Sequence, residues 1–165
     1  MVSAQAGVRL GGVELEESKI MLWEKSNTSN TTKFSEKKKI KSAKILVIDD
    51  EPEITDIVET FLESAGYEVK SENSSVIGIE RAKTFLPDLI LLDIMMPFMD
   101  GYDVCKELKK NEETSKIPVV FLTGKDARSD EGRSFQSGGD LFVKKPFSCE
   151  RLLEIVKVVL SSLNK

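Results

Sequence analysis

The sequence predicts a doubly wound α/β fold for residues 44–165, with a five-stranded parallel sheet in the order 2-1-3-4-5. Continuous apolar runs recur along this part of the chain, amphipathic stretches lie between them, and polar or acidic residues follow most of the runs. Such runs are typical of strands buried on both faces of a parallel sheet. Regular alternation of strand and helix implies right-handed crossovers between parallel strands.

Five segments are expected to form the strands. Four are apolar runs, whereas the second segment alternates apolar and polar side chains as an edge strand does. The expected strands are residues 45–48, 67–70, 88–93, 117–122 and 141–143. The order 2-1-3-4-5 is common for five strands of this kind, and it places the carboxyl ends of the first and third strands side by side.

Five helices are expected between and after these strands. The first has the clearest signals, because Pro52 suits the first helical turn, apolar residues recur at helical spacing from Ile54 to Leu62, and Gly66 is a suitable stop. The other expected helices are residues 77–85, 104–108, 127–135 and 152–163.

Composition excludes several classes of protein. The chain has 165 residues, 40% of them hydrophobic and 32% charged, which fits one soluble globular domain with additional chain. No apolar run approaches the roughly 20 residues that cross a bilayer, and no apolar signal segment follows Met1. We therefore expect a cytoplasmic protein without membrane association, in which Cys105 and Cys149 are free thiols.

The absence of histidine narrows the chemistry further. The sequence contains none, which excludes a Ser-His or Cys-His nucleophilic pair, metal ligation by histidine and phosphohistidine on this chain. Carboxylates, hydroxyls, lysine and a hard cation remain as the chemical groups available.

Charge divides the chain into two parts. Residues 1–44 hold nine Lys and Arg against five acidic residues, while residues 45–165 hold 15 against 23. A polar stretch at residues 27–32 precedes a lysine-rich stretch at residues 37–41. We expect residues 1–43 to be a flexible polar and basic extension and residues 44–165 to be the folded domain. A nucleic-acid or anionic-membrane patch is the alternative interpretation of the lysines.

Acidic residues follow the first and third expected strands. Asp49, Asp50 and Glu51 come after residues 45–48, and Asp93 ends residues 88–93. Converging carboxylates repel one another, and a cation among them makes their ionised forms tenable. Oxygen ligands alone suit a hard ion, above all Mg²⁺. Alternatively, the first three acids favour the N-terminus of the next helix, and Asp93 is a turn residue.

A hydroxyl and an ammonium group follow the remaining two strands. Thr123-Gly124 comes after residues 117–122, and Lys145-Pro146 comes shortly after residues 141–143. Considered separately, Thr123 is more often a strand-end residue and Lys145 a solvated charge. Their placement with the acids at four strand ends favours a functional site.

Together these motifs resemble the receiver domain of bacterial response regulators in two-component signalling. The motifs, one for each expected strand end, are Asp49-Asp50, Asp93 with Met96-Pro97 and Met99-Asp100-Gly101, Thr123-Gly124, and Lys145-Pro146. The resemblance extends from about Lys44 to the C-terminus. It implies a flavodoxin-like fold and a stand-alone receiver similar to the chemotaxis regulators.

The resemblance also implies the chemistry of the acids. Asp93 is identified with the residue that accepts a phosphoryl group from a phosphohistidine of a partner, a known use of a carboxylate nucleophile. Asp49, Asp50, Asp93 and the backbone carbonyl of Met95 are identified with the ligands of Mg²⁺ or Mn²⁺. The residues alone do not distinguish Asp93 from Asp50 as the nucleophile, and the resemblance makes that choice.

Further roles follow from the resemblance for the other motif residues. Lys145 is expected to pair with a phosphoryl oxygen, and the family often has a cis peptide bond before the following proline. Thr123 is expected to donate its hydroxyl to the phosphoryl group, and Gly124 to leave room for access. Phe142 occupies the place of the aromatic residue that switches with Thr123.

The function implied is that of a single-domain response regulator. It is expected to promote its own phosphotransfer and autodephosphorylation without being an enzyme. Its expected partners are a sensor histidine kinase or histidine phosphotransfer protein and a downstream protein target. The acidic charge of residues 45–165 disfavours direct DNA binding. The fourth helix, fifth strand and fifth helix form the family's usual contact face, for a target or for a homodimer.

Two other functions remain open. A Mg²⁺-dependent phosphohydrolase of the haloacid-dehalogenase type would also use an aspartate nucleophile, but it requires a second Asp two residues later, where this chain has Met95. A binding module that is never phosphorylated would not require the complete set of acids, threonine and lysine. Turnover of a phosphate ester would indicate the phosphohydrolase. Partner binding that is insensitive to Asp93→Asn would indicate the binding module.

Overall fold

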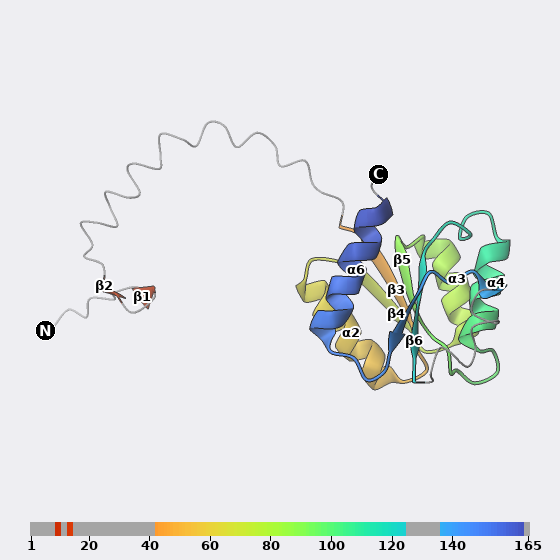
Figure 1. Ribbon diagram of the computed structural model, residues 1–165, viewed down its shortest axis with the longest axis horizontal. Helices are drawn as coiled ribbons and strands as arrows, with labels where there is room; N and C mark the ends of the chain where they lie inside the picture. Colours follow the sequence, from red (N-terminus) through yellow and green to blue (C-terminus); the bar gives the residue numbers. More distant parts are fainter. Residues whose placement is uncertain (1–8, 11–12, 15–41, 125–135, 164–165) are drawn as a thin grey trace, which may run out of the picture. The chain divides into compact units, whose positions relative to one another are not determined.

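Figure 1 presents the computed structural model of the chain, which describes residues 9–10, 13–14, 42–124 and 136–163. The chain divides into two units, residues 1–41 and 42–165. In the first unit, β1 (Arg9–Leu10) pairs antiparallel with β2 (Val13–Glu14). Most of the expected extension at residues 1–43 lies outside the described residues, so its flexibility and its boundary stay predictions.

The second unit is built on a five-stranded parallel sheet. Its strands are β3 (Lys44–Ile48), β4 (Glu68–Glu72), β5 (Leu89–Asp93), β6 (Val119–Thr123) and β7 (Leu141–Lys144). They lie in the order β4-β3-β5-β6-β7, which confirms the predicted order 2-1-3-4-5. The central strand β5 pairs with β3 and β6, and all five of its residues are buried.

Four helices accompany the sheet in the described residues of this unit. They are α2 (Pro52–Ser64), α3 (Ser75–Phe85), α4 (Gly101–Lys110) and α6 (Cys149–Leu163). Helix α4 begins earlier than the apolar pattern indicated, because Asp100 caps it by accepting a hydrogen bond from the Asp103 N–H at 3.0 Å. The helix expected at residues 127–135 lies outside the described residues.

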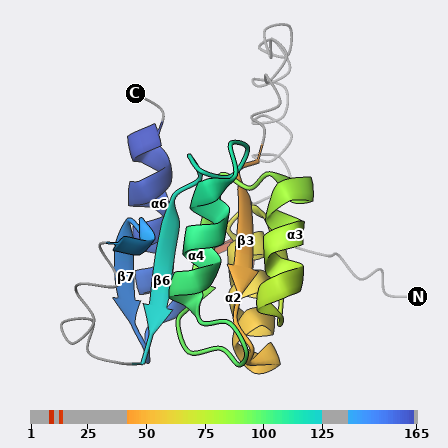
Figure 2. The ribbon, with the colours of Figure 1, turned by 90° about the vertical axis from the view of Figure 1, so that its right-hand side faces the viewer.

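The helices cover both faces of the sheet, as Figures 1 and 2 show. Helices α2 and α6 pack on one face, and α3 and α4 on the other. Within β3, Ile45 and Val47 face the α2 and α6 layer, whereas Leu46 and Ile48 face the α3 and α4 layer. Side chains alternate between the two faces of a strand, so the continuous apolar runs reflect burial on both sides.

Two smaller predictions also concern this unit. Both Cys105, which is buried, and Cys149, which is partly buried, are free thiols as expected. No helix in the described part of the chain is long and apolar enough to cross a bilayer.

Candidate functional site

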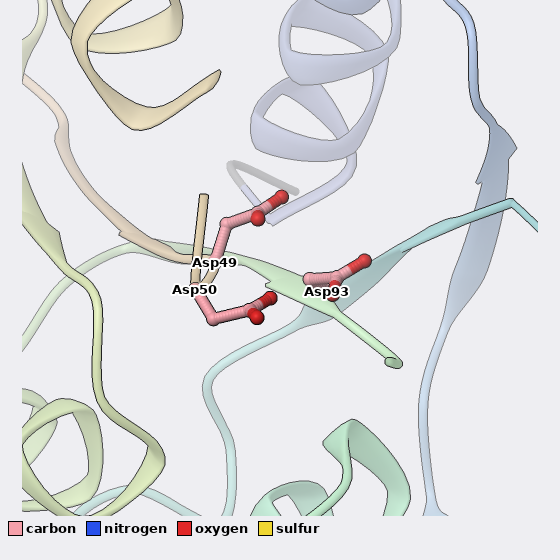
Figure 3. Close-up of side chains that lie close together, drawn as sticks. All are labelled: Asp49, Asp50 and Asp93. Atoms are coloured by element: carbon pink, nitrogen blue, oxygen red, sulfur yellow. The ribbon is translucent and has the colours of Figure 1, made fainter. Parts of the chain in front are cut away.

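Three carboxylates meet where β3 and β5 end. Asp49 and Asp50 follow β3, and Asp93 is the last residue of β5. Figure 3 shows the three side chains gathered at these adjoining strand ends, and one carboxylate oxygen from each lies within 4.8 Å of the others. Asp93 is only 3% exposed and Asp49 is fully buried, whereas Asp50 is partly exposed and lines a surface pocket.

Asp49 is held by hydrogen bonds to the surrounding backbone and side chains. Its N–H donates to the Glu72 carbonyl at 3.2 Å, and its Oδ1 accepts from the Glu51 N–H at 3.0 Å. The Asn73 Nδ2 donates to the Asp49 carbonyl at 2.8 Å and to Thr55 Oγ1 at 3.0 Å. The sequence patterns did not assign Asn73 to the site, although its position directly after the edge strand β4 places it at the same end of the sheet.

Lys145 brings a positive charge to the carboxylates from the segment after β7. Its Nζ lies 2.6 Å from Asp49 Oδ2, 3.2 Å from Asp93 Oδ1 and 3.3 Å from Glu51 Oε1. The Lys145 N–H also donates to the Thr123 carbonyl at 2.7 Å, and the Lys145–Pro146 peptide bond is cis, as the resemblance implied. The ammonium group therefore offsets part of the negative charge that the acids concentrate.

The site changes the ionisation of its members. Burial and the charge of Asp49 raise the pKa of Asp93 from 3.8 to about 6, although Lys145 acts in the opposite direction. Burial opposes the charge on Lys145, but its hydrogen bond to Asp49 and the charges of Asp93 and Asp49 outweigh burial and raise the pKa of the ammonium group. The ionised form of Asp93 is therefore disfavoured in this site, whereas Lys145 remains a cation.

Gly101 allows the start of α4 to lie directly against the end of β5. A Cβ at this residue would stand 2.2 Å from the Asp93 carbonyl oxygen and 2.8 Å from the Cα of Ile94. The Gly101 N–H donates to the Ile94 carbonyl at 2.9 Å. The motif Met99-Asp100-Gly101 marked this glycine in the sequence, but its role in permitting close approach to Asp93 emerges only from the packing.

The other predicted site residues lie at the same edge of the sheet or near it. Thr123 is the buried last residue of β6, and Gly124 after it is exposed, with no described atom within 4 Å of a Cβ built there. Met95 follows Asp93 by two residues and its side chain is 55% exposed. The access role of Gly124 and the backbone role of Met95 stay predictions.

Phe142 lies farther from the acids, within β7. Its ring is partly buried and stacks on Phe121 of β6, with ring centroids 5.1 Å apart and planes inclined by 27°. Phe121 in turn meets Tyr102 of α4 edge-on at 5.2 Å. The aromatic side chain on the fifth strand is thus packed against the strand that carries Thr123.

The donor set fits a hard divalent cation. All three side chains supply carboxylate oxygen, the ligand atom that Mg²⁺ prefers. One oxygen from each side chain lies within 4.8 Å of the others, which is close to the largest separation, about 4.2 Å, of two oxygens bound to one Mg²⁺ at about 2.1 Å. The arrangement combines a divalent-ion site, a buried carboxylate with a raised pKa and a fixed ammonium group.

Comparisons with known proteins agree with this geometry. Residues 45–157 match the family described as the response regulator receiver domain. The chain is 42% identical over 117 residues to the DNA-binding dual master transcriptional regulator RpaA of Synechocystis, and 38% identical over 117 residues to the alkaline phosphatase synthesis regulator PhoP of Bacillus subtilis. Each match covers 71% of this chain and 48% of the relative, so the chain spans about half the length of these two curated relatives.

Solved structures give the same result for the fold. The chemotaxis protein CheY4 of Vibrio cholerae superimposes with a TM-score of 0.69 at 28% identity, covering 72% of this chain and 98% of CheY4. The receiver domain of the sensor kinase PA1611 from Pseudomonas aeruginosa superimposes with a TM-score of 0.67 at 27% identity, covering 73% of this chain and 98% of that domain. That structure carries a magnesium ion coordinated in its active-site cleft.

Proposed function

The chain belongs to the response regulator receiver family, and from this premise we propose that it accepts a phosphoryl group from a partner phosphohistidine onto Asp93. The observation that carries the proposal is the position of Asp93, buried at the end of β5 between two further acids and 3.2 Å from the Lys145 ammonium. A sensor histidine kinase or a histidine phosphotransfer protein is the proposed donor.

The transfer requires an ionised Asp93 as the nucleophile. With a pKa of about 6, most Asp93 side chains are ionised at pH 7 even though the carboxylate is buried. An Asp93 oxygen forms the new bond to phosphorus while the bond from phosphorus to the donor imidazole nitrogen breaks, and the leaving imidazole takes a proton from solvent. Lys145, already beside Asp93, supplies positive charge for a phosphoryl oxygen.

The same acids are proposed to hold Mg²⁺ or Mn²⁺. Asp49, Asp50, Asp93 and the Met95 carbonyl are the proposed ligand set. A bound ion would supply positive charge that offsets the negative charge of the transferring phosphoryl group. Hydrogen bonds from Glu51 and Asn73 hold Asp49 in place, which favours a preformed site.

Switching is proposed to use β7, which is one of the two edge strands of the sheet, and its neighbour β6. The Thr123 hydroxyl would donate to the phosphoryl group, and Gly124 would leave the approach open. Thr123 pairs with Lys144, and Phe121 pairs and stacks with Phe142. Because of these contacts, a displacement at the end of β6 would also move β7.

The proposed surface for a target protein or a second copy of the chain is the expected fourth helix, which lies outside the described residues, together with β7 and α6. Leu141 of β7 and Val158 of α6 are exposed apolar residues there, and they line one surface pocket with Arg151 and Glu154. An apolar centre with charged neighbours suits a protein contact.

An exposed Met95 in place of a second aspartate argues against the alternative of a phosphohydrolase.

Intact mass spectrometry after incubation with Mg²⁺ and acetyl phosphate tests the proposal. The native chain is expected to gain one phosphoryl group, and Asp93→Asn none. Asp88→Asn, at the residue directly before β5, is the matched control and should be phosphorylated as the native chain is. Undiminished uptake by Asp93→Asn would remove Asp93 from its proposed role, and uptake that persists in excess EDTA would remove the metal from the reaction.

A further inference from the structure

Phe98, in the loop between β5 and α4, has an unusual combination of backbone and side-chain environment. Its φ angle is +67°, in the left-handed region that bulky residues rarely adopt. The Met99 N–H donates to the Pro97 carbonyl at 2.8 Å, so Phe98 is the central residue of a three-residue turn. A turn of this kind with positive φ is rare and strained.

The side chain does not compensate for the strain by packing. Phe98 is fully exposed, so its ring removes almost no apolar surface from water. Leu86 is the other non-glycine residue with positive φ in the described part of the chain, at +49°, but it caps the C-terminus of α3, where a left-handed residue is common. Phe98 has no such structural role, and an outlier of this kind points to function.

The position of Phe98 connects it to the phosphorylation site. It lines a pocket of about 150 Å³ together with Asp50, whose side chain is the only charged one in the pocket lining, and with Asn73, which positions Asp49. Val76, which lines the same pocket, is apolar and 62% exposed, and Met95, three residues before Phe98 in the chain, is apolar and 55% exposed. We call Val76, Met95 and Phe98 the apolar rim.

We propose that Phe98 is a docking residue for the protein that donates the phosphoryl group, and that its ring packs against an apolar side chain beside the donor's phosphohistidine. The inference rests on the function proposed for Asp93. Reacting atoms must approach to about 3–3.5 Å, and Asp93 is almost fully buried, so a protein donor has to lay its surface over the residues around the site.

The chemistry of the apolar rim indicates which part of the donor it contacts. Exposed aromatic side chains contribute strongly to protein interfaces when a partner covers them. Lys145 and the exposed carboxylate of Glu51 form a charged part of the site that does not line the pocket of Phe98. The donor is therefore expected to place apolar surface on the side of Phe98 and polar groups on the side of Lys145. A small phosphodonor covers none of the apolar rim.

The test compares two donors with one set of variants. Phe98→Asn removes the ring and keeps a residue that tolerates positive φ, while Phe98→Tyr keeps an aromatic ring. Leu86→Asn makes the same kind of change at Leu86, the other exposed non-glycine residue with positive φ in the described part of the chain, which lies shortly before β5. The donors are acetyl phosphate and an autophosphorylated histidine kinase, chosen from the kinases of the source genome as the one that phosphorylates the native chain fastest.

The measured quantity is the ratio of the kinase-dependent rate to the acetyl phosphate-dependent rate, each at subsaturating donor. We expect Phe98→Asn to lower this ratio at least tenfold, and Phe98→Tyr and Leu86→Asn to leave it within about twofold of the native value. The unfolding midpoint of Phe98→Asn should be no lower than that of the native chain.

Either of two results would overturn the inference. A ratio within twofold of the native value in Phe98→Asn would show that the ring does not contribute to docking. A tenfold loss of the phosphorylation rate with both donors alike would show that Phe98 acts in the phosphoryl transfer itself and not in binding the protein donor. Failure of the native chain to take a phosphoryl group from either donor would instead contradict the proposed function of Asp93.

Discussion

Replacing Asp93 with asparagine should make the chain more stable at neutral pH while removing the proposed phosphoacceptor. The native carboxylate is buried beside Asp49, and both effects disfavour its charge. Asparagine has nearly the same size and carries no charge. The substitution therefore relieves electrostatic repulsion without leaving a cavity.

The pKa of Asp93 determines how large this gain in stability should be. A rise from 3.8 to about 6 corresponds to about 3 kcal/mol of unfavourable free energy for the ionised form in the native state, at about 1.4 kcal/mol per unit of pKa. The side chain is only 4% exposed, so solvent screening reduces this value little. The pKa already includes the opposing attraction to Lys145, so about 3 kcal/mol is the upper limit, and we expect a net stabilisation of about 1–3 kcal/mol.

The dependence on pH has a definite sign. The native state of Asp93 binds a proton more readily than the unfolded state, so this residue's destabilising effect is complete above about pH 7 and fades as pH falls through 6 towards 4. The stability difference between Asp93→Asn and the native chain should fade over the same range.

Urea unfolding in EDTA, from pH 4 to pH 8, measures this difference. A variant that is less stable than the native chain at pH 7.5, or a stability gain that does not change between pH 8 and pH 4, would refute the reasoning. Adding Mg²⁺ should narrow the gap, because the ion binds the folded native site and stabilises it by mass action.

Three further predictions concern the residues that shape the site. Gly101→Ala should lower the unfolding free energy by about 2 kcal/mol or more, because its Cβ would meet the Asp93 backbone, whereas Gly124→Ala, which has open space, should change it little in the same denaturation assay. Asn73→Ala should cost about 1 kcal/mol of stability and weaken Mg²⁺ binding several-fold in a metal titration, and unchanged affinity would show that Asn73 does not position the site. Asp50→Ala should weaken Mg²⁺ binding more than Asn73→Ala does, and a smaller effect would argue against Asp50 as a ligand.

Much of the fold could be predicted because its signals are local. The apolar run from Ile45 to Ile48 and the run that ends at Asp93 are buried on both faces, so their composition identified them as strands without knowledge of their neighbours. Element boundaries were less certain. Helix α4 begins at Gly101, where a capping aspartate and not the apolar pattern determines the start.

The candidate site was predictable for a topological reason. Parallel strands of a doubly wound sheet end at one edge, so residues that follow the strands must gather there. That argument brought together Asp49, Asp50, Asp93, Thr123 and Lys145 without any contact being known. It could not foresee Asn73 or the role of Gly101, since each depends on which backbone atoms approach one another across different elements.

By itself the sequence determined the fold class, the strand order and the set of polar residues at the carboxyl edge of the sheet, because hydrophobic pattern and connectivity are properties of the chain. Only the tertiary structure decided that the Lys145 ammonium lies closer to Asp49 than to Asp93, that the pKa of Asp93 is raised, and that Phe98 is exposed in a strained turn. Distances, burial and backbone conformation arise from how distant segments pack, and no local pattern encodes them.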